Sequence, residues 1–205
     1  MAAKKNAKKR AKAASTPAAP AKTAKTAKTA KRASPGTPDK VAGKVTPTQS
    51  SRNVDIGIAT DDRRRIAEGL SRFLADSYTL YLKTHNFHWN VTGPMFNSLH
   101  NMFMDQYTEQ WTALDEIAER IRALGEFAPQ SFGNLTSIRD GNPEAEWEAM
   151  VDELKSDNET VCRTAREIFP SAEKAGDQAT LDLITQRFQA HEKHAWMLRS
   201  TLGGK

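Results

Sequence analysis

Cysteine is almost absent from this chain, since Cys162 is the only one among 205 residues. An intrachain disulfide is therefore excluded, which fits a reducing compartment such as the cytoplasm. No apolar run approaches the roughly 20 residues that a membrane-spanning helix needs. The lysines near the N-terminus are not followed by the apolar segment of a secretory signal. We therefore expect a cytoplasmic protein that does not use a membrane.

Acidic residues are almost absent from the first 54 positions. That segment holds 14 Lys or Arg and one acid, Asp39, which gives +13. The remaining residues hold 16 basic and 24 acidic groups, or −8, and the two sums reproduce the overall +5. We therefore expect two parts, a basic tail over 1–54 and an acidic body over 55–205.

The tail also lacks aromatic residues, and its AKTAKTAKTAKR segment is a low-complexity repeat. It cannot bury enough apolar surface to offset its ordering entropy, so we expect disorder. Without rings to stack on bases, such a polycation is expected to bind double-stranded DNA through phosphates, without sequence preference. A solubilising tail and an acidic membrane surface are the alternatives. The cations expected to contact DNA are Lys4, Lys5, Lys8, Lys9, Arg10, Lys12, Lys22, Lys25, Lys28, Lys31 and Arg32.

The body shows helical periodicity and no competing strand pattern. Apolar spacing predicts four long helices over about 60–89, 95–124, 144–169 and 177–202. We expect a cap near Thr60, a stop before Gly125 and another stop at Pro170. A short helix near 135–139 is also expected in the long connection. This pattern predicts an all-α four-helix bundle with a crossover between the second and third helices.

Four metal-binding side chains stand out in the first two helices: His88, His100, Asp115 and Glu119. The two carboxylates are four residues apart and share a helix face. Asp115 follows His100 by fifteen residues, or roughly 22 Å along a helix, which is too far to share a metal. No histidine has Glu three residues before it, so an internal ferritin-type di-iron site is not expected. A two-fold partner could complete the site, whereas interface salt bridges are the blander interpretation.

The segments THNFHWNVTG, FNSLH and LDEIAERIRALG resemble the Dps family (DNA protection during starvation), which are small ferritin-like proteins. The resemblance covers roughly residues 56–202. It implies a ferritin-like fold and a dodecameric shell that stores ferric mineral. It also implies ferroxidase sites between subunits, with His88 and His100 from one chain and Asp115 and Glu119 from the other. The implied cofactor is iron, the implied oxidant is preferentially hydrogen peroxide, and the implied location is the bacterial nucleoid.

One position departs from the family pattern. The family commonly has an acid four residues after the second histidine, where this chain has Met104, and Asp105 follows one residue later. A shift of one residue turns the side chain by about 100° around the helix. Asp105 is therefore a weak candidate ligand, and we expect one firmly bound iron and a looser second. A structural nucleoid protein with a degenerate metal site is the alternative.

Other candidates carry weaker signals. Trp89 adjoins His88 and is either interface packing or an electron donor that quenches oxidant near the iron. His191 and His194 are one turn apart, which suits metal binding but also ordinary packing. Glu173 and Asp182 lie around the start of the last helix, where acids commonly just favour the helix dipole. The resemblance makes these two acids candidates for lining the pore through which iron enters.

Overall fold

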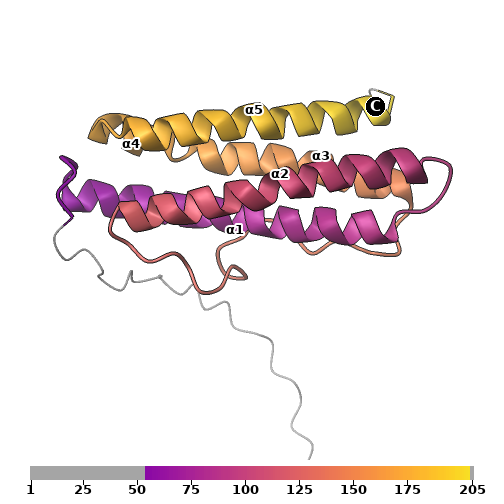
Figure 1. Ribbon diagram of the computed structural model, residues 1–205, viewed down its shortest axis with the longest axis horizontal. Helices are drawn as coiled ribbons and strands as arrows, with labels where there is room; N and C mark the ends of the chain where they lie inside the picture. The colour runs from indigo at the N-terminus through magenta and orange to yellow at the C-terminus, as the bar shows by residue number, and fades with distance from the viewer. Residues whose placement is uncertain (1–53, 204–205) are drawn as a thin grey trace, which may run out of the picture. The chain divides into compact units, whose positions relative to one another are not determined.

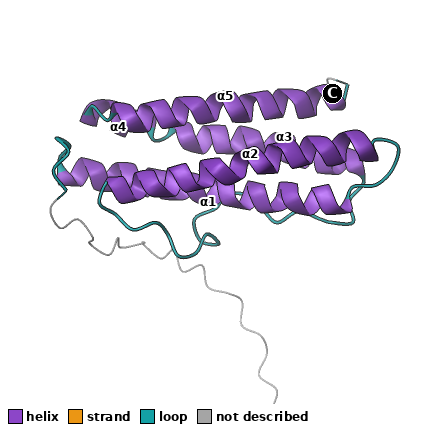
Figure 2. Ribbon diagram, viewed as in Figure 1, coloured by secondary structure: helices purple, strands orange, loops and turns teal. Residues whose placement is uncertain are grey.

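The computed structural model describes residues 54–203, which form five α-helices and no strand (Figure 2). The helices are α1 (Thr60–Asn90), α2 (Phe96–Ala123), α3 (Trp147–Arg166), α4 (Phe169–Ala175) and α5 (Gln178–Thr201). The predicted all-α four-helix fold is confirmed, with α4 as an additional short helix. None of the helices in this part of the chain has the length and apolarity needed to cross a membrane.

The helices stack in two layers, each an antiparallel pair (Figure 1). The first layer holds α1 and α2, the second holds α3 and α5, and α1 also packs on α3. A short turn joins α1 to α2, whereas residues 124–146 run back along the bundle before α3 begins. Because of this crossover, α3 runs in the same direction as α2, and the predicted topology is confirmed.

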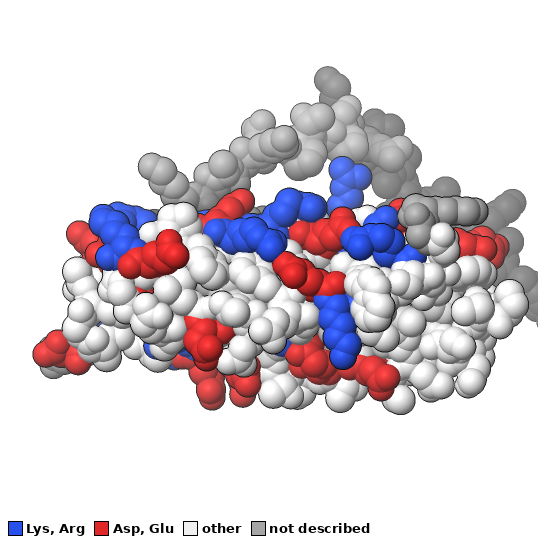
Figure 3. Space-filling model, turned by 90° about the horizontal axis from the view of Figure 1, so that it is seen from above, with Lys and Arg blue, Asp and Glu red and all other residues white. Residues whose placement is uncertain are grey.

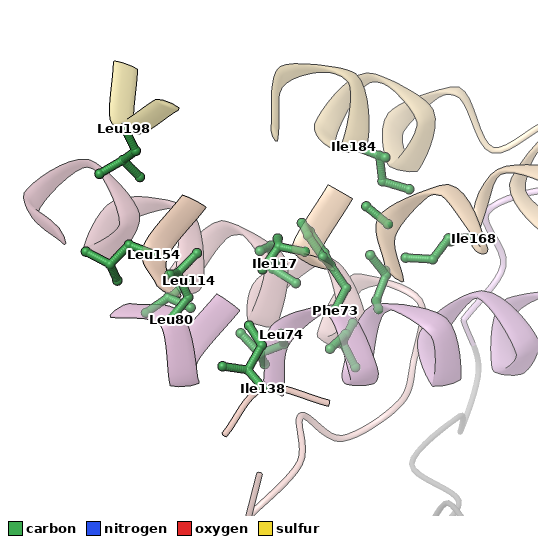
Figure 4. Close-up of a cluster of buried hydrophobic side chains, with 14 of the residues drawn as sticks. Phe73, Leu74, Leu80, Leu114, Ile117, Ile138, Leu154, Ile168, Ile184 and Leu198 are labelled. Carbon is green, nitrogen blue, oxygen red and sulfur yellow. The ribbon is translucent and has the colours of Figure 1, made fainter. Parts of the chain in front are cut away.

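Aliphatic and phenylalanine side chains fill the space between the layers. Leu80 of α1, Leu114 of α2 and Leu154 of α3 lie close together in the interior (Figure 4). Each fully buried side chain of this size contributes roughly 1.5–3 kcal/mol by leaving water. The core therefore fixes the rotation of each helix, and with it the residues that face outward.

The crossover is anchored by a buried carboxylate of α1. Asp76 accepts hydrogen bonds from the Ser137 backbone N–H at 2.6 Å and from the Thr136 hydroxyl at 3.0 Å. The hydroxyls of Ser137 and Thr164 donate to it as well. The short helix expected over 135–139 is wrong, because these side chains and this N–H bind Asp76 instead of forming a helical turn.

Three predicted helix ends also need correction. The α1 N-cap position is Ala59, and Thr60 instead accepts a hydrogen bond from Arg63. The third helix is shorter than expected, because a turn precedes Trp147 and the helix ends at Arg166. Pro170 lies in the first turn of α4 rather than ending α3, since proline fits the first turn of a helix.

An ion pair holds the end of α2 against the start of α5. The Arg120 guanidinium donates to Asp177 at 2.6 Å and to the Thr180 hydroxyl at 2.9 Å. Asp177 also caps α5 by accepting from the Thr180 backbone N–H at 3.0 Å. Burial alone would raise the pKa of Asp177, but the hydrogen bonds from Arg120 and Thr180 outweigh burial and lower it.

Candidate metal centre

Two histidines from neighbouring helices lie face to face at one end of the α1–α2 pair. His88 belongs to the last turn of α1, and His100 lies near the start of α2. Their ring centroids are 3.8 Å apart and their planes differ by 22°. The turn between the helices contains Gly93 at a φ of +91°, a conformation that favours glycine. This tight turn brings together side chains that are twelve residues apart.

Each histidine is oriented by the backbone of the other. His88 Nδ1 lies 2.8 Å from the His100 carbonyl oxygen, and His100 Nδ1 lies 2.9 Å from the His88 carbonyl oxygen. A carbonyl oxygen only accepts, so each Nδ1 carries the proton, and the neutral ring has its lone pair on Nε2. A backbone carbonyl is a common outer partner of a metal-binding histidine. Both rings are therefore held in the tautomer that suits metal binding through Nε2.

The two candidate carboxylates lie on the outward side of α2. Asp115 and Glu119 are both exposed and one helical turn apart. Asp115 lines a shallow hollow of about 550 Å³, whose other walls include Tyr78, Trp111 and Phe132. Neither carboxylate has a hydrogen bond or ion pair within residues 54–203, so both are free to accept a cation.

The structure does not bring the carboxylates to the histidines within one chain. Residues 54–203 contain no group of three or more His, Cys, Asp or Glu side chains that could hold a metal ion. His100 and Asp115 are separated by fifteen helical residues, or roughly 22 Å. The four predicted ligands therefore form two separate half-sites, a histidine half-site and a carboxylate half-site.

The position that departs from the family pattern faces outward. Met104 is 39% exposed. Asp105 is exposed as well. Neither residue contacts the histidine pair through a hydrogen bond, so the role of Asp105 as a weak ligand stays a prediction.

Trp89 and His85 lie beside the histidine half-site. Trp89 is 64% exposed, and its ring centroid lies 4.2 Å from that of His85. The His85 ring also stacks on Tyr107 at 4.2 Å. Burial, together with the nearby His88, lowers the pKa of His85, so its neutral form is favoured.

Sequence reasoning treated several aromatic residues only as apolar positions. In the structure, Tyr81, His85, Tyr107 and Trp111 form a row of contacting rings, named here the aromatic stripe. The signal was available in the sequence, because Tyr107, Trp111, Asp115 and Glu119 succeed one another every four residues. The stripe joins the two half-sites along the outward side of α1 and α2.

The predicted pore acids lie near the α4–α5 junction. Glu173 of α4 and Asp182 of α5 are both exposed, and Asp182 accepts a hydrogen bond from Gln186 at 2.8 Å. Asp177 lies between them in sequence but is buried and bound to Arg120. Glu173 and Asp182 therefore remain the acids of this segment that are available to solvent, and their pore role stays a prediction.

The other histidine pair is buried inside the bundle. His191 Nδ1 lies 2.9 Å from Asn158 Oδ1, and its Nε2 lies 3.3 Å from Arg187 Nη2. Arg187 is itself paired with Glu109 of α2. Burial, then Arg187 and His194, lower the pKa of His191 well below 6.5. Both nitrogens of His191 are occupied, which favours the packing interpretation over metal binding.

Comparison with known proteins identifies the family. A family profile for the ferritin-like domain matches residues 67–204. The DNA protection during starvation protein 2 of Bacillus anthracis is 37% identical over 142 residues, covering 68% of this chain and 97% of that protein. This chain belongs to the Dps family.

Crystal structures of Dps proteins share the same bundle. That of Vibrio cholerae O1 has a TM-score of 0.69 and 29% identity, covering 74% of this chain and 97% of that one. It is described as a member of a broad superfamily of ferritin-like diiron-carboxylate proteins. The Dps protein of Bacillus brevis has a TM-score of 0.67 and 32% identity, covering 71% and 99% respectively. The ferritin-like fold and the resemblance to the Dps family are therefore confirmed.

The family-profile match and the described residues both leave out nearly all of the basic tail. The profile match begins at residue 67, and the described residues begin at 54. The predicted boundary near residue 54 and the eleven predicted DNA-contacting cations thus stay predictions for this Dps protein.

Proposed function

We propose that this chain is a DNA-protecting, iron-storing ferroxidase. It binds Fe(II) at sites between two-fold-related subunits, with His88 and His100 from one chain and Asp115 and Glu119 from the other. It oxidises the iron, preferentially with hydrogen peroxide, and stores the ferric product inside a dodecameric shell. Its tail binds DNA without sequence preference, which associates the protein with the bacterial nucleoid.

The reciprocal hydrogen bonds of His88 and His100 carry the proposal. They use Nδ1 of each ring and leave each Nε2 without a hydrogen-bond partner among the described residues, in near-parallel rings 3.8 Å apart. The carboxylate half-site lies further along α2 than His100. Its two side chains are exposed and have no hydrogen bond or ion pair within residues 54–203. Two antiparallel copies would place each half-site beside its complement. Imidazole and carboxylate ligands together suit iron, and also zinc or manganese.

The reaction needs two electrons for each peroxide. Two Fe(II) ions become two Fe(III) ions, while one hydrogen peroxide and two protons become two water molecules. A one-electron reduction would instead release a hydroxyl radical, so pairing the electrons is the protective step. The protein contributes ligands, fixed imidazole orientation and an interface that limits solvent access.

The acidic body suits iron uptake and storage. Residues 55–205 carry a formal charge of −8. Exposed Glu173 and Asp182 would concentrate cations at the pore through which iron enters the shell. Acidic side chains facing the cavity would then nucleate the ferric mineral.

DNA binding is assigned to the tail because the folded body offers no matching surface on the face in view. Figure 3 shows acidic and basic side chains interspersed over that face of the bundle. The tail carries +13, and a shell of twelve chains presents twelve tails at once. Phosphate neutralisation by such tails predicts binding that is independent of sequence and falls steeply with salt.

An anaerobic Fe(II) titration followed by peroxide tests the iron function on protein of known oligomeric mass. We expect saturable binding, two Fe(II) oxidised per peroxide and a soluble ferric product. Failure to oxidise Fe(II) faster than buffer alone would reject the ferroxidase and favour a structural nucleoid protein. Met104 at the departing position is the observation that supports this alternative.

A retardation assay tests the DNA function. Removing residues 1–54 should weaken binding to unrelated duplexes by orders of magnitude and leave iron oxidation unchanged. A matched control keeps the tail length but changes Lys22, Lys25, Lys28 and Lys31 to Gln. This control should show intermediate affinity and a shallower salt dependence. Equal binding by the truncated protein would leave the tail a solubilising role.

A further inference from the structure

A row of oxidisable rings connects the histidine half-site to the carboxylate half-site of the same chain. The centroids of His88 and Tyr107 are 5.2 Å apart, and those of Tyr107 and Tyr81 are 6.3 Å apart. The next step, from Tyr81 to Trp111, is 5.7 Å. Trp111 precedes Asp115 by one helical turn and lines the same hollow. No step in the row exceeds ordinary ring contact.

The residue types in this row are chemically distinctive. Tyrosine and tryptophan are the side chains that most readily lose a single electron. The chain has three tyrosines and four tryptophans. All three tyrosines lie on the aromatic stripe or beside it, since Tyr78 contacts Tyr81 at 5.9 Å. Phenylalanine could also pack at these positions, but its ring loses an electron far less readily.

We propose that the aromatic stripe carries single electrons between the two iron sites of one dimer interface. The inference rests on the proposed function, in which the half-sites of one chain belong to two different iron sites. Each subunit then contributes one stripe, so two symmetry-related stripes join the same pair of sites. An iron in one site can thereby supply an electron to peroxide reduced at the other.

The route supplies the second electron that peroxide requires at a site where Met104 replaces the usual acid. If each site holds one iron firmly, that iron supplies one of the two electrons that peroxide requires. Tyr107 supplies the second, and its phenol releases one proton. An electron from Fe(II) at the other site then passes through Trp111 and Tyr81 and, with one proton, restores Tyr107. The sum is two Fe(III), two waters and no hydroxyl radical from one peroxide, two Fe(II) and two protons.

The surroundings of Tyr81 fit a relay of neutral phenols. Burial, and then the neighbouring Tyr78 and Tyr107, raise the pKa of Tyr81. The ring therefore begins each cycle protonated, and losing an electron also requires losing a proton. His85 lies beside both phenols, because its ring stacks on Tyr107 at 4.2 Å and contacts Tyr81 at 5.8 Å.

Electron paramagnetic resonance on rapidly frozen samples tests the relay. Assembled protein is loaded anaerobically with Fe(II) and mixed with peroxide. At one Fe(II) per dimer, about half of the loaded sites face an empty second site and should leave a tyrosyl radical. At one Fe(II) per subunit, the second iron refills the ring and the radical yield per iron should approach zero. Ring-deuterated tyrosine should narrow the signal and identify the residue type.

Phenylalanine substitutions locate the path while preserving the rings. Tyr107→Phe should abolish the tyrosyl signal and increase hydroxyl-radical capture by a spin trap. Tyr81→Phe should keep a Tyr107 radical but prevent its refilling, so the signal should persist at full loading. Trp196→Phe is the matched control, because Trp196 is 60% exposed on α5 and lies outside the stripe. The proposal would be overturned if the radical yield did not change with the amount of Fe(II) loaded per subunit. It would also be overturned if the yield depended on Trp89 instead of the stripe.

An iron-free measurement separates this proposal from the proposed function. In a variant that keeps Trp111 as its single tryptophan, laser photoionisation creates a tryptophan radical without any metal. Its conversion to a tyrosyl radical is expected, and it should be lost when Tyr81→Phe is added. A tryptophan radical that decays identically in both variants would overturn the relay even if iron oxidation is normal. Normal transfer without any iron oxidation would instead reject the ferroxidase function.

Discussion

Two histidine pairs in this chain have the same side chains and different hydrogen-bond partners. His88 and His100 donate Nδ1 protons to backbone carbonyls at the edge of the α1–α2 pair. His191 and His194 lie inside the bundle, where Asn158 binds one His191 nitrogen. The other His191 nitrogen faces a guanidinium. A metal ion would have to displace that hydrogen bond and approach a positive charge.

The comparison teaches that spacing alone does not identify a metal-binding histidine. His191 and His194 are one turn apart, the separation of many metal-binding pairs, whereas His88 and His100 are twelve residues apart. What distinguishes them is the lone pair. The backbone carbonyls that bind His88 and His100 accept only the Nδ1 protons and leave each Nε2 free. The partners of His191 occupy both of its ring nitrogens.

The largest expected effect separates the two pairs directly. His100→Ala should slow peroxide-driven Fe(II) oxidation by more than the roughly 10–100-fold that loss of an outer partner costs a metal site. His194→Ala should leave the initial rate unchanged. Stopped-flow absorbance of Fe(III) formation measures both, with shell mass as a control for assembly. A normal rate in His100→Ala would remove this histidine from the site.

Mixed shells sharpen the assignment to two chains. His100→Ala and Asp115→Ala subunits, each inactive alone, should regain activity when dissociated and reassembled together. Random pairing makes half of the interfaces mixed, and each contains one intact site, so about one quarter of the sites should recover. No recovery, despite mixed interfaces demonstrated by mass spectrometry, would contradict the intersubunit arrangement.

The buried pair should instead determine stability. Asn158→Ala leaves His191 Nδ1 without its partner in the interior, which should cost about 1–3 kcal/mol. The thermal midpoint should fall while the oxidation rate per folded shell stays unchanged. Differential scanning calorimetry and the same stopped-flow assay provide the two readouts. A slower rate at unchanged stability would show that the interior pair serves the chemistry.

A smaller effect, a gain in affinity for a second iron, is expected at position 104. Met104→Asp introduces a carboxylate where the family commonly has one and should strengthen binding of a second iron by roughly tenfold. Anaerobic calorimetric titration should then show a second resolved binding step per subunit. Met104→Asn is a control of similar size without the charge. Identical isotherms for parent and Met104→Asp would mean that position 104 does not face the metal.

The smallest effect concerns pH. Because the pKa of His191 is lowered in the fold, the unfolded chain binds more protons wherever the pH lies between the folded value and 6.5. Its stabilising contribution is therefore complete above pH 6.5 and is lost as the pH falls through the folded pKa. The thermal midpoint should drop between about pH 7 and about pH 5. His191→Gln should reduce this drop, and an equal drop in both proteins would exclude His191 as its source.

The helices could be predicted because their apolar residues recur with one period. The core positions Ile66, Leu70 and Phe73 have that spacing and are fully buried. The crossover could not be predicted, since its conformation depends on Asp76, a residue about 60 positions away. Local propensity does not include a distant buried carboxylate that binds Ser and Thr.

The candidate site was only partly predictable for a similar reason. Helix length alone separated His100 from Asp115 and suggested two half-sites. The carbonyl partners that select the histidine tautomer depend on how tightly α1 folds back on α2. The contact between Tyr81 and Tyr107 depends on the packing of the same two helices, so spacing within either helix does not reveal it.

The contact between Arg120 and Asp177 has a consequence for how two subunits meet. Arg120 immediately follows Glu119, so its bond to the cap of α5 fixes the rotation of the last turns of α2. A helix is stiff over this length, and Asp115 inherits the same orientation. In the proposed dimer, the torsions of the two carboxylate side chains would remain to be ordered. The loss of conformational entropy on association is thereby smaller, which is the thermodynamic advantage of a preorganised surface.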